Sequence, residues 1–202
     1  MTPARSPRQR LSEEDRRTQI LQACLAVVAA QGYARTSLSA VATQAGVSKG
    51  LVSHYFGGHD TLMEQTARAA LVELRTAVVD DLDLAAPVPQ IIRSAVHRVA
   101  HLPKTHATQL AAIGQIVLNL RDAQGTPRLD LDAYEETYAG QEELFRRGQR
   151  EGDLRQFDTR VMAVTYQSAV DAMLTYLAKH PQEDPDRYAD ELTALLLNAM
   201  RA

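Results

Sequence analysis

Apolar residues recur along almost the whole of this chain at the three- and four-residue spacing of one helix face. In residues 13–31, for example, Ile20, Cys24 and Val28 share a face, and Gly32 ends the run. No segment shows the sustained alternation of apolar and polar residues that is typical of a half-buried strand. We therefore predict an all-α protein of about nine helices.

Capping residues and helix breakers divide this pattern into segments. Ser12, Ser37 and Ser48 can each accept a hydrogen bond from a backbone N–H of the following turn, which begins a helix. Gly46 and Gly152 can each end one. The helices that we expect span about residues 13–31, 37–46, 49–55, 60–79, 87–101, 103–122, 126–151, 158–179 and 184–202.

The composition indicates a globular protein without a membrane span. Apolar residues make up 45% of the 202 residues. The longest apolar stretch, LQACLAVVAA at residues 21–30, is much shorter than the roughly 20 residues that cross a bilayer. The arginines near the N-terminus are followed by no apolar segment, and the single cysteine, Cys24, excludes an internal disulfide. We expect a cytoplasmic protein with a structural thiol and no membrane partner.

Basic side chains are concentrated in the N-terminal part of the chain. Residues 1–60 hold seven Lys and Arg but only four Asp and Glu, whereas the whole chain holds 22 and 25 and has a net charge of −3. A positive segment on an otherwise acidic protein favours a polyanionic partner for that segment alone.

Two short helices and a glycine turn lie in this positive segment. A helix of about eight residues, a turn at Gly46 and a second helix capped by Ser48 form the pattern of a helix-turn-helix, whose second helix enters the major groove of DNA. Val47, Val52 and Phe56 fall on the inward face of that helix, which leaves its other side chains outside. The alternative is a helical hairpin with a solvated polar face.

The outward side chains suit DNA contacts of several kinds. Lys49 can reach a guanine edge or a phosphate, and Ser53 and His54 can bind base edges. Gly50 permits a close approach of the backbone, and Leu51 can touch a thymine methyl group. The residues expected to contact phosphate are Tyr55, Thr36, Ser37 and the cap residue Ser48.

Residues 32–63, GYARTSLSAVATQAGVSKGLVSHYFGGHDTLM, resemble the DNA-binding domain of the tetracycline-repressor (TetR) family, and VSHYFGG is most similar to its choline-responsive subgroup. The resemblance implies a DNA-binding domain over residues 1–58. It also implies a helical domain over residues 59–202 that binds a small molecule and forms a homodimer. A lysine usually meets a phosphate where this chain has His59, which adds His59 to the predicted DNA contacts. An aromatic residue is common where this chain has Ser53.

The last two expected helices carry more apolar residues than one protomer should need. The resemblance implies that they pack against a twofold mate as a four-helix interface. The alternative is that these residues form the core of a monomer, and the first of the two helices is expected to serve both purposes. The predicted interface residues are Val161, Ala169, Met173, Tyr176, Leu192, Leu195 and Leu196.

The region between residues 87 and 179 holds single polar and aromatic side chains within apolar patterns. Small-molecule pockets use such sparse polar groups to orient a ligand. The region shows no obvious aromatic cage for a quaternary ammonium group, so choline is not the effector that we expect. Each of these residues alone could equally be an interior or a surface group. The predicted ligand-binding residues are His97, His101, Gln115, Asn119, Tyr134, Tyr138, Phe145, Tyr166 and Asp171.

Two histidines in this region have the spacing of metal ligands. His97 and His101 lie four residues apart on one helix face, and His106 follows. The chain has no HExxH motif and no cysteine partner for them. We predict no bound metal and no other cofactor.

The chain also lacks the common catalytic motifs. It has no glycine-rich phosphate loop and no GxSxG, and its acidic pairs fall on a long amphipathic helix where charge is usually solvated. We predict that the protein is not an enzyme but a repressor that leaves a palindromic double-stranded DNA operator when a small molecule binds. The alternative is a DNA-binding module whose C-terminal domain responds to a protein partner, and an enclosed cavity would favour the small molecule.

Overall fold

A computed structural model describes residues 12–129 and 134–201 of the chain. Over these residues the prediction of an all-α fold with about nine helices is confirmed, and the described residues form no strand. A short 3₁₀-helix spans Tyr33–Arg35. The helices are α1 (Glu13–Gln31), α2 (Leu38–Ala45), α3 (Lys49–Phe56), α4 (His59–Val79), α5 (Val88–Thr105), α6 (Ala107–Asn119), α7 (Glu135–Glu151), α8 (Thr159–Lys179) and α9 (Pro185–Met200).

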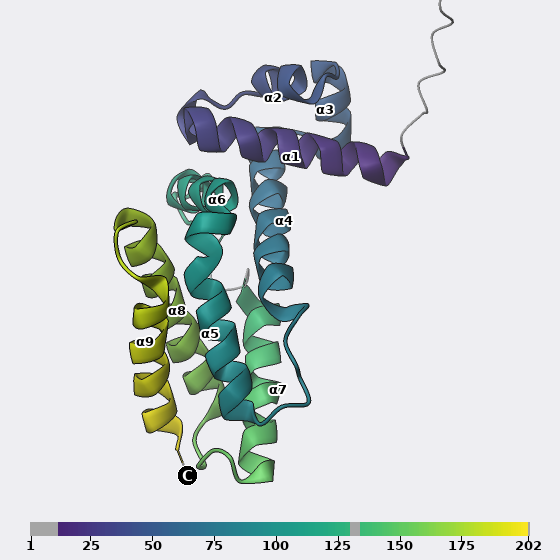
Figure 1. Cartoon of the computed structure of the whole chain (residues 1–202). Helices are drawn as coiled ribbons and strands as arrows, with labels where there is room; N and C mark the ends of the chain where they lie inside the picture. The colour runs from purple at the N-terminus through teal and green to yellow at the C-terminus, as the bar shows by residue number, and fades with distance from the viewer. Residues whose placement is uncertain (1–11, 130–133, 202) are drawn as a thin grey trace, which may run out of the picture.

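The helices form a small head on an elongated body (Figure 1). The head consists of α1 to α3, with α1 lying across the end of α4. The body consists of α4 to α9, in which α5, α7, α8 and α9 run roughly along its length and α6 lies beneath α1. The described C-terminus lies at the end of the body farthest from the head (Figure 1).

Local capping explains why the head helices begin and end where the sequence predicts. The hydroxyl groups of Ser12, Ser37 and Ser48 accept hydrogen bonds from backbone N–H groups three residues further on, at 3.0, 3.2 and 3.1 Å. Gly46 ends α2 in the left-handed conformation (φ 65°), which glycine adopts without strain.

Two expected helix boundaries are wrong. Helix α5 continues through Pro103 to Thr105, because a proline in the last turn removes only one backbone hydrogen bond and the turn persists. Thr126 and Pro127 do not start a helix. The carboxylate of Asp122 accepts hydrogen bonds from the backbone of Gln124 and Thr126, which stabilises a turn there, and α7 begins only at Glu135.

Two clusters of buried apolar side chains hold the molecule together. The head core joins α1, α2 and α3 to the first half of α4, to α6 and to Leu129. The body core joins α5, α7, α8 and α9 to the far end of α4. Arg128 adds a polar link, because its guanidinium donates to Glu64 of α4 at 2.8 Å. The head core therefore includes residues beyond position 58, and the domain division at 58/59 stays a prediction.

The described residues also bear on two expectations from composition. None of their helices combines the length and the apolar character needed to cross a bilayer. Cys24 is fully buried in the head core, where burial raises the pKa of its thiol to about 11. The thiol is therefore protonated at neutral pH and packs as an apolar group.

Candidate nucleic-acid interface and ligand-binding residues

The second helix of the helix-turn-helix is fixed on the head by its inward face. Val52 and Phe56 are buried in the head core. Arg17 of α1 stacks its guanidinium over the Phe56 ring at 4.8 Å and donates to the carbonyl of Tyr55 at 3.2 Å. The same guanidinium donates to Gln65 of α4. Arg17 thus joins α1, α3 and α4, a positioning role that helical spacing alone does not reveal.

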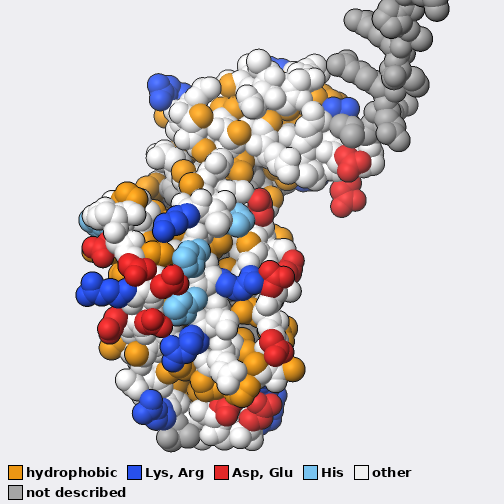
Figure 2. Space-filling model, viewed as in Figure 1, with side chains coloured by type: hydrophobic (Ala, Val, Ile, Leu, Met, Phe, Trp, Pro, Cys, Tyr) orange, Lys and Arg blue, Asp and Glu red, His pale blue; other side chains and the backbone are white. Residues whose placement is uncertain are grey.

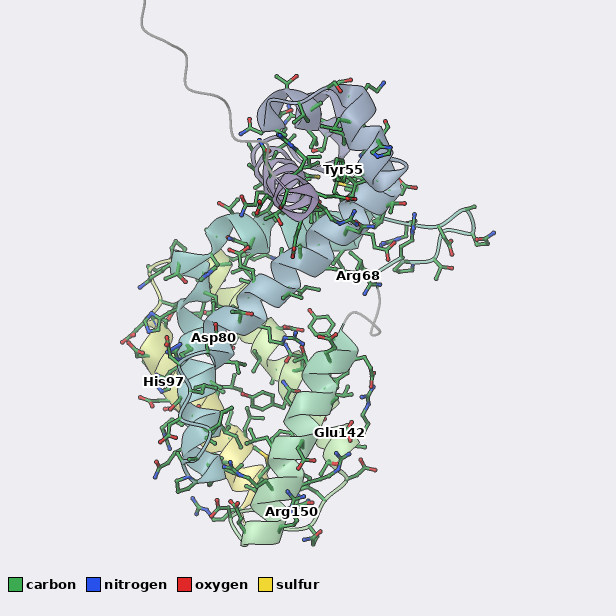
Figure 3. The ribbon with its side chains drawn as sticks, turned by 90° about the vertical axis from the view of Figure 1, so that its right-hand side faces the viewer. Tyr55, Arg68, Asp80, His97, Glu142 and Arg150 are labelled. Atoms are coloured by element: carbon green, nitrogen blue, oxygen red, sulfur yellow. The ribbon has the colours of Figure 1, made fainter. Side chains whose placement is uncertain are left out.

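The outward face of α3 is open to solvent at its N-terminal end. Ser48, Lys49, Gly50 and His54 are exposed, and Leu51, Ser53 and Tyr55 are partly buried at its rim. Tyr55 lies on the head in Figure 3. The first backbone N–H groups of a helix lack intrahelical partners, so this end of α3 also suits an anion.

The charge on the head fits a polyanion. On the face shown in Figure 2, acidic side chains lie over the body and at the N-terminal end of α1, and the top of the head carries none. Ser37, at the start of α2, is exposed on the same domain and caps its helix through its hydroxyl.

Two side chains that we predicted to contact phosphate have partners inside the protein. Thr36 is only 4% exposed, and its hydroxyl donates to the carbonyl of Gly32 at 3.0 Å. The His59 ring lies between the carbonyl of Thr36, 2.9 Å from Nε2, and the carboxylate of Asp60, 3.2 Å from Nδ1. Its edge also faces the ring of Tyr33. The Thr36 hydroxyl is thus held by a local contact four residues back, whereas the contact of His59 with Thr36 joins segments that folding brings together.

His97 and His101 lie on the outside of the body, between α5 and α9. The two ring nitrogens of His97 are each 3.1 Å from a carboxylate oxygen, Nδ1 from Asp186 and Nε2 from Asp190. His101 Nε2 is 3.0 Å from the same oxygen of Asp186. Hydrogen bonds from His101 and His97 hold the pKa of Asp186 below its usual value. Figure 2 shows histidine side chains on the body near acidic side chains.

These contacts place the two histidines in a surface ion-pair network and apart from the other predicted ligand residues. Within residues 12–129 and 134–201, no group of three or more His, Cys, Asp or Glu is arranged to hold a metal ion. Gln115 and Asn119 are exposed on α6, where the amide of Asn119 donates to the carbonyl of Gln115 at 2.7 Å.

The other five predicted ligand residues meet between α7 and α8. The rings of Tyr134 and Tyr138 stack with centroids 5.9 Å apart, and Phe145 meets Tyr166 edge-on at the same distance. Burial raises the pKa of Asp171, which accepts a hydrogen bond from Gln167 at 2.9 Å and another from the Tyr134 hydroxyl. The structure thus brings Tyr134, Tyr138 and Asp171 into one polar group, and Phe145 and Tyr166 into the body core beneath it.

Two glutamines that the sequence did not single out complete this group. Gln167 precedes Asp171 by one helical turn, and Gln141 of α7 donates to the side-chain carbonyl of Gln167 at 2.8 Å. A polar residue one turn before Asp171 was the available signal, but the partner on α7 depends on how the two helices pack.

A small hollow and a larger groove on the described surface are lined by none of the predicted ligand residues. One, of about 80 Å³, lies where α5 meets the connection from α8 to α9. The other, of about 400 Å³, is an open groove along α8 and α9, lined by Tyr176, Tyr188, Leu192 and Leu195 among others.

The predicted dimer residues divide into two groups. Val161 and Leu195 are 63% and 68% exposed, and Tyr176 is exposed as well. Ala169 and Leu192 are partly buried. Met173 and Leu196 lie in the body core of the same protomer, so their apolar surface is already covered without a mate. A helical period assigns residues to a face but does not tell which neighbour covers it.

The N-terminal part of the chain matches a known family. Residues 20–66 match the family model described as bacterial regulatory proteins, tetR family. HTH-type transcriptional regulator BetI 2 of Chromohalobacter salexigens is 44% identical over 66 residues, which are 33% of this chain and 32% of that protein. BetI of Paraburkholderia xenovorans is 46% identical over 61 residues, 30% and 31% of the two chains. The match spans about a third of the length of these curated relatives.

Several solved structures have a fold similar to that of this chain over most of its length. The fatty acid degradation regulator FadR of Bacillus halodurans superimposes with a TM-score of 0.73 at 20% identity, over 94% of this chain and 97% of that one. FadR of Bacillus subtilis in complex with stearoyl-CoA gives 0.72 at 18% identity, over 89% and 97%. A TetR-family transcriptional regulator of Haemophilus influenzae gives 0.73 at 16% identity, over 96% and 100%. Residues 20–66 therefore match the tetR family of bacterial regulatory proteins, and the described helices share the fold of solved structures that include a TetR-family regulator.

Proposed function

We propose that this protein is a homodimeric transcriptional repressor that leaves a palindromic operator when a small molecule binds its body. The observation that carries the proposal is the N-terminal turn of α3, where Ser48, Lys49, Gly50 and His54 are exposed on a helix that Val52 and Phe56 hold rigidly in the head. A recognition helix must present such side chains to the edges of bases. The effector-binding part is supported by the solved neighbour that holds stearoyl-CoA.

The arrangement of the helices suggests how a body could control a head. In a twofold dimer two copies of α3 meet successive major grooves, whose centres lie about 34–36 Å apart. Helix α4 belongs to both cores, so a change in the body core that tilts α4 would alter the separation of the two heads. DNA would be released because two half-sites could no longer be occupied together.

The test is selection from a pool of random duplex DNA by the purified protein at near-physiological salt. A dimeric repressor should enrich an inverted repeat, and its affinity should fall steeply with salt because bound phosphates release counterions. If a folded dimer enriches no motif, the repressor proposal is wrong.

A second candidate, a DNA-binding module that responds to a protein, is favoured by one observation. The hollow beside α5 and the groove along α8 and α9 both lie away from the residues between α7 and α8. The two candidates differ in which component of a cell extract should release the protein from the selected operator. A small effector passes a filter that retains proteins and survives protease, whereas a protein partner does neither.

The dimer should depend on Leu195, which projects from α9 with 68% of its surface exposed. Burying a leucine contributes about 1.5–3 kcal/mol, and a twofold interface buries two copies. We expect Leu195→Asp to weaken dimerisation at least about tenfold, measured by sedimentation equilibrium. Leu84→Asp is the matched control, because Leu84 is 53% exposed in the connection between α4 and α5. Equal dimer affinity in both variants would contradict an interface at α9.

A further inference from the structure

The side chain of Asp171 is a half-buried carboxylate without a cationic partner. It accepts hydrogen bonds from Gln167 and Tyr134, and no Lys, Arg or His among the described residues acts on it. Arg160, in the first turn of the same helix α8, is engaged elsewhere. It binds Glu135 at 2.7 and 2.8 Å and Glu142 at 3.3 Å, with its guanidinium 4.7 Å from the centre of the Tyr138 ring. Carboxylates removed from water are usually paired with a cation.

The connection just before α7 offers no cation either. Residues 130–133 read Asp-Leu-Asp-Ala, and none of these side chains is basic. Tyr134, which donates a hydrogen bond to Asp171, follows these four residues directly, so the charged residues just before Tyr134 in the sequence are all acidic. No residue that the structure describes supplies a positive group to Asp171.

A second acceptor in the same hydrogen-bond chain also lacks a partner. The amide nitrogen of Gln141 donates to Gln167, but the Gln141 side-chain oxygen is buried and accepts no hydrogen bond from any described residue. An unsatisfied buried acceptor is unusual and costs free energy that a donor would recover. Gln141, Gln167 and Asp171 thus form a chain of hydrogen bonds. Its two ends, the Gln141 side-chain oxygen and the Asp171 carboxylate, are both acceptors.

The surroundings of these acceptors are aromatic and apolar. Tyr134 and Tyr138 present stacked rings next to Asp171, and Phe145 and Tyr166 lie in the body core below. Aromatic faces attract cations, and the core offers contacts to a hydrocarbon group. Helix α7, on which Glu142 is labelled, lies on the side of the body that faces the viewer in Figure 3.

We propose that the effector is a protonated amine with N–H donors, bound between α7 and α8 with its ammonium group against Asp171. The ammonium group replaces the Tyr134 hydroxyl as a hydrogen-bond donor to Asp171. The side-chain oxygen of Gln141 accepts a hydrogen bond from another N–H of the amine. This inference rests on the proposed function, because it names the class of molecule to which the repressor responds. Anions are repelled by Asp171, and a cation without N–H groups leaves the Gln141 oxygen unsatisfied.

Thermal unfolding with four six-carbon probes that differ in their polar group, and one aromatic amine, tests the charge and the donors separately. The probes are n-hexylamine, benzylamine, n-hexanol, hexanoate and hexyltrimethylammonium. At pH 7 the two primary amines should raise the melting temperature, and the alcohol, the anion and the quaternary ammonium should not. Asp171→Asn should weaken amine binding by about tenfold or more, because a charge-assisted hydrogen bond is lost.

Asp80→Asn is the matched control for the charge. Asp80 is exposed at the end of α4 and is labelled in Figure 3, so its amide variant should bind amines like the unchanged protein. Should Asp171→Asn fail to fold, Gln141→Leu replaces it, and this variant should also bind amines more weakly. The proposal is wrong if neither amine shifts the melting temperature, if hexanol or hexanoate shifts it equally, or if the folded Asp171→Asn protein responds unchanged.

Operator binding separates this inference from the proposed function. Amines that stabilise the protein through Asp171 without any selected operator would support the site and contradict the repressor. An inverted repeat whose complex resists every amine would support the repressor and overturn the amine as effector.

Discussion

Replacing Gly148 by valine is expected to destabilise the protein by about 3 kcal/mol, the upper end of the usual cost of overpacking a core. Gly148 is buried on α7, and a Cβ atom there would lie 2.7 Å from Cδ1 and Cγ of Leu154 and 3.1 Å from Cγ1 of Val88. Leu154 and Val88 are themselves 3% and 0% exposed, so neither can move aside without disturbing the body core. Urea unfolding at fixed protein concentration measures the loss.

Gly140 on the same helix provides the matched control. It is exposed, and a Cβ atom there would have no neighbour within 4 Å. Because valine has a somewhat higher helix propensity than glycine, Gly140→Val should change the stability by less than about 0.5 kcal/mol. Similar losses at both positions would mean that α7 does not pack through Gly148.

Replacing Lys49 by alanine is expected to weaken operator binding by about tenfold in each protomer, and so by about 100-fold in a dimer that presents two copies. Lys49 is exposed at the first position of α3, directly after the cap residue Ser48. Its ammonium group can reach a phosphate or a guanine edge. Fluorescence anisotropy with the selected operator measures the affinity, and the salt dependence should become shallower if the contact is to phosphate.

Lys104→Ala removes the same charge from the body, where Lys104 is exposed near the end of α5. This control should bind the operator almost as tightly as the unchanged protein at near-physiological salt, because charges far from the DNA are screened. If Lys49→Ala binds as well as Lys104→Ala, then α3 does not read the operator as we propose.

These two predictions rest on different kinds of information. The exposure of Lys49 follows from local sequence, since Ser48 caps α3 and the helical period turns Val52 and Phe56 inward. The contact between Gly148 and Leu154 follows only from how the chain turns after α7. Nothing in the residues around Gly148 marks it as different from Gly140.

The ligand residues show the same division. The sequence singled out Asp171 and Tyr134 as polar groups in apolar patterns, and the structure places them in contact. The same criterion selected His97, which packs against acidic residues of α9 on the outside of the body. A pattern shows that a polar residue lies near an apolar face, but its partners belong to another helix.

Local sequence was enough to predict the helical fold, the caps of the head helices and the resemblance of the N-terminal domain to the tetR family. These properties depend on residues within a few positions of one another, because caps, glycine turns and helical periods are short-range interactions. It took the packing of the helices to show that His59 meets the carbonyl of Thr36, that Met173 and Leu196 lie in the body core, and that Gln141 joins Asp171's hydrogen-bond chain. Each of these depends on contacts between helices far apart in the chain, which a helical period does not specify.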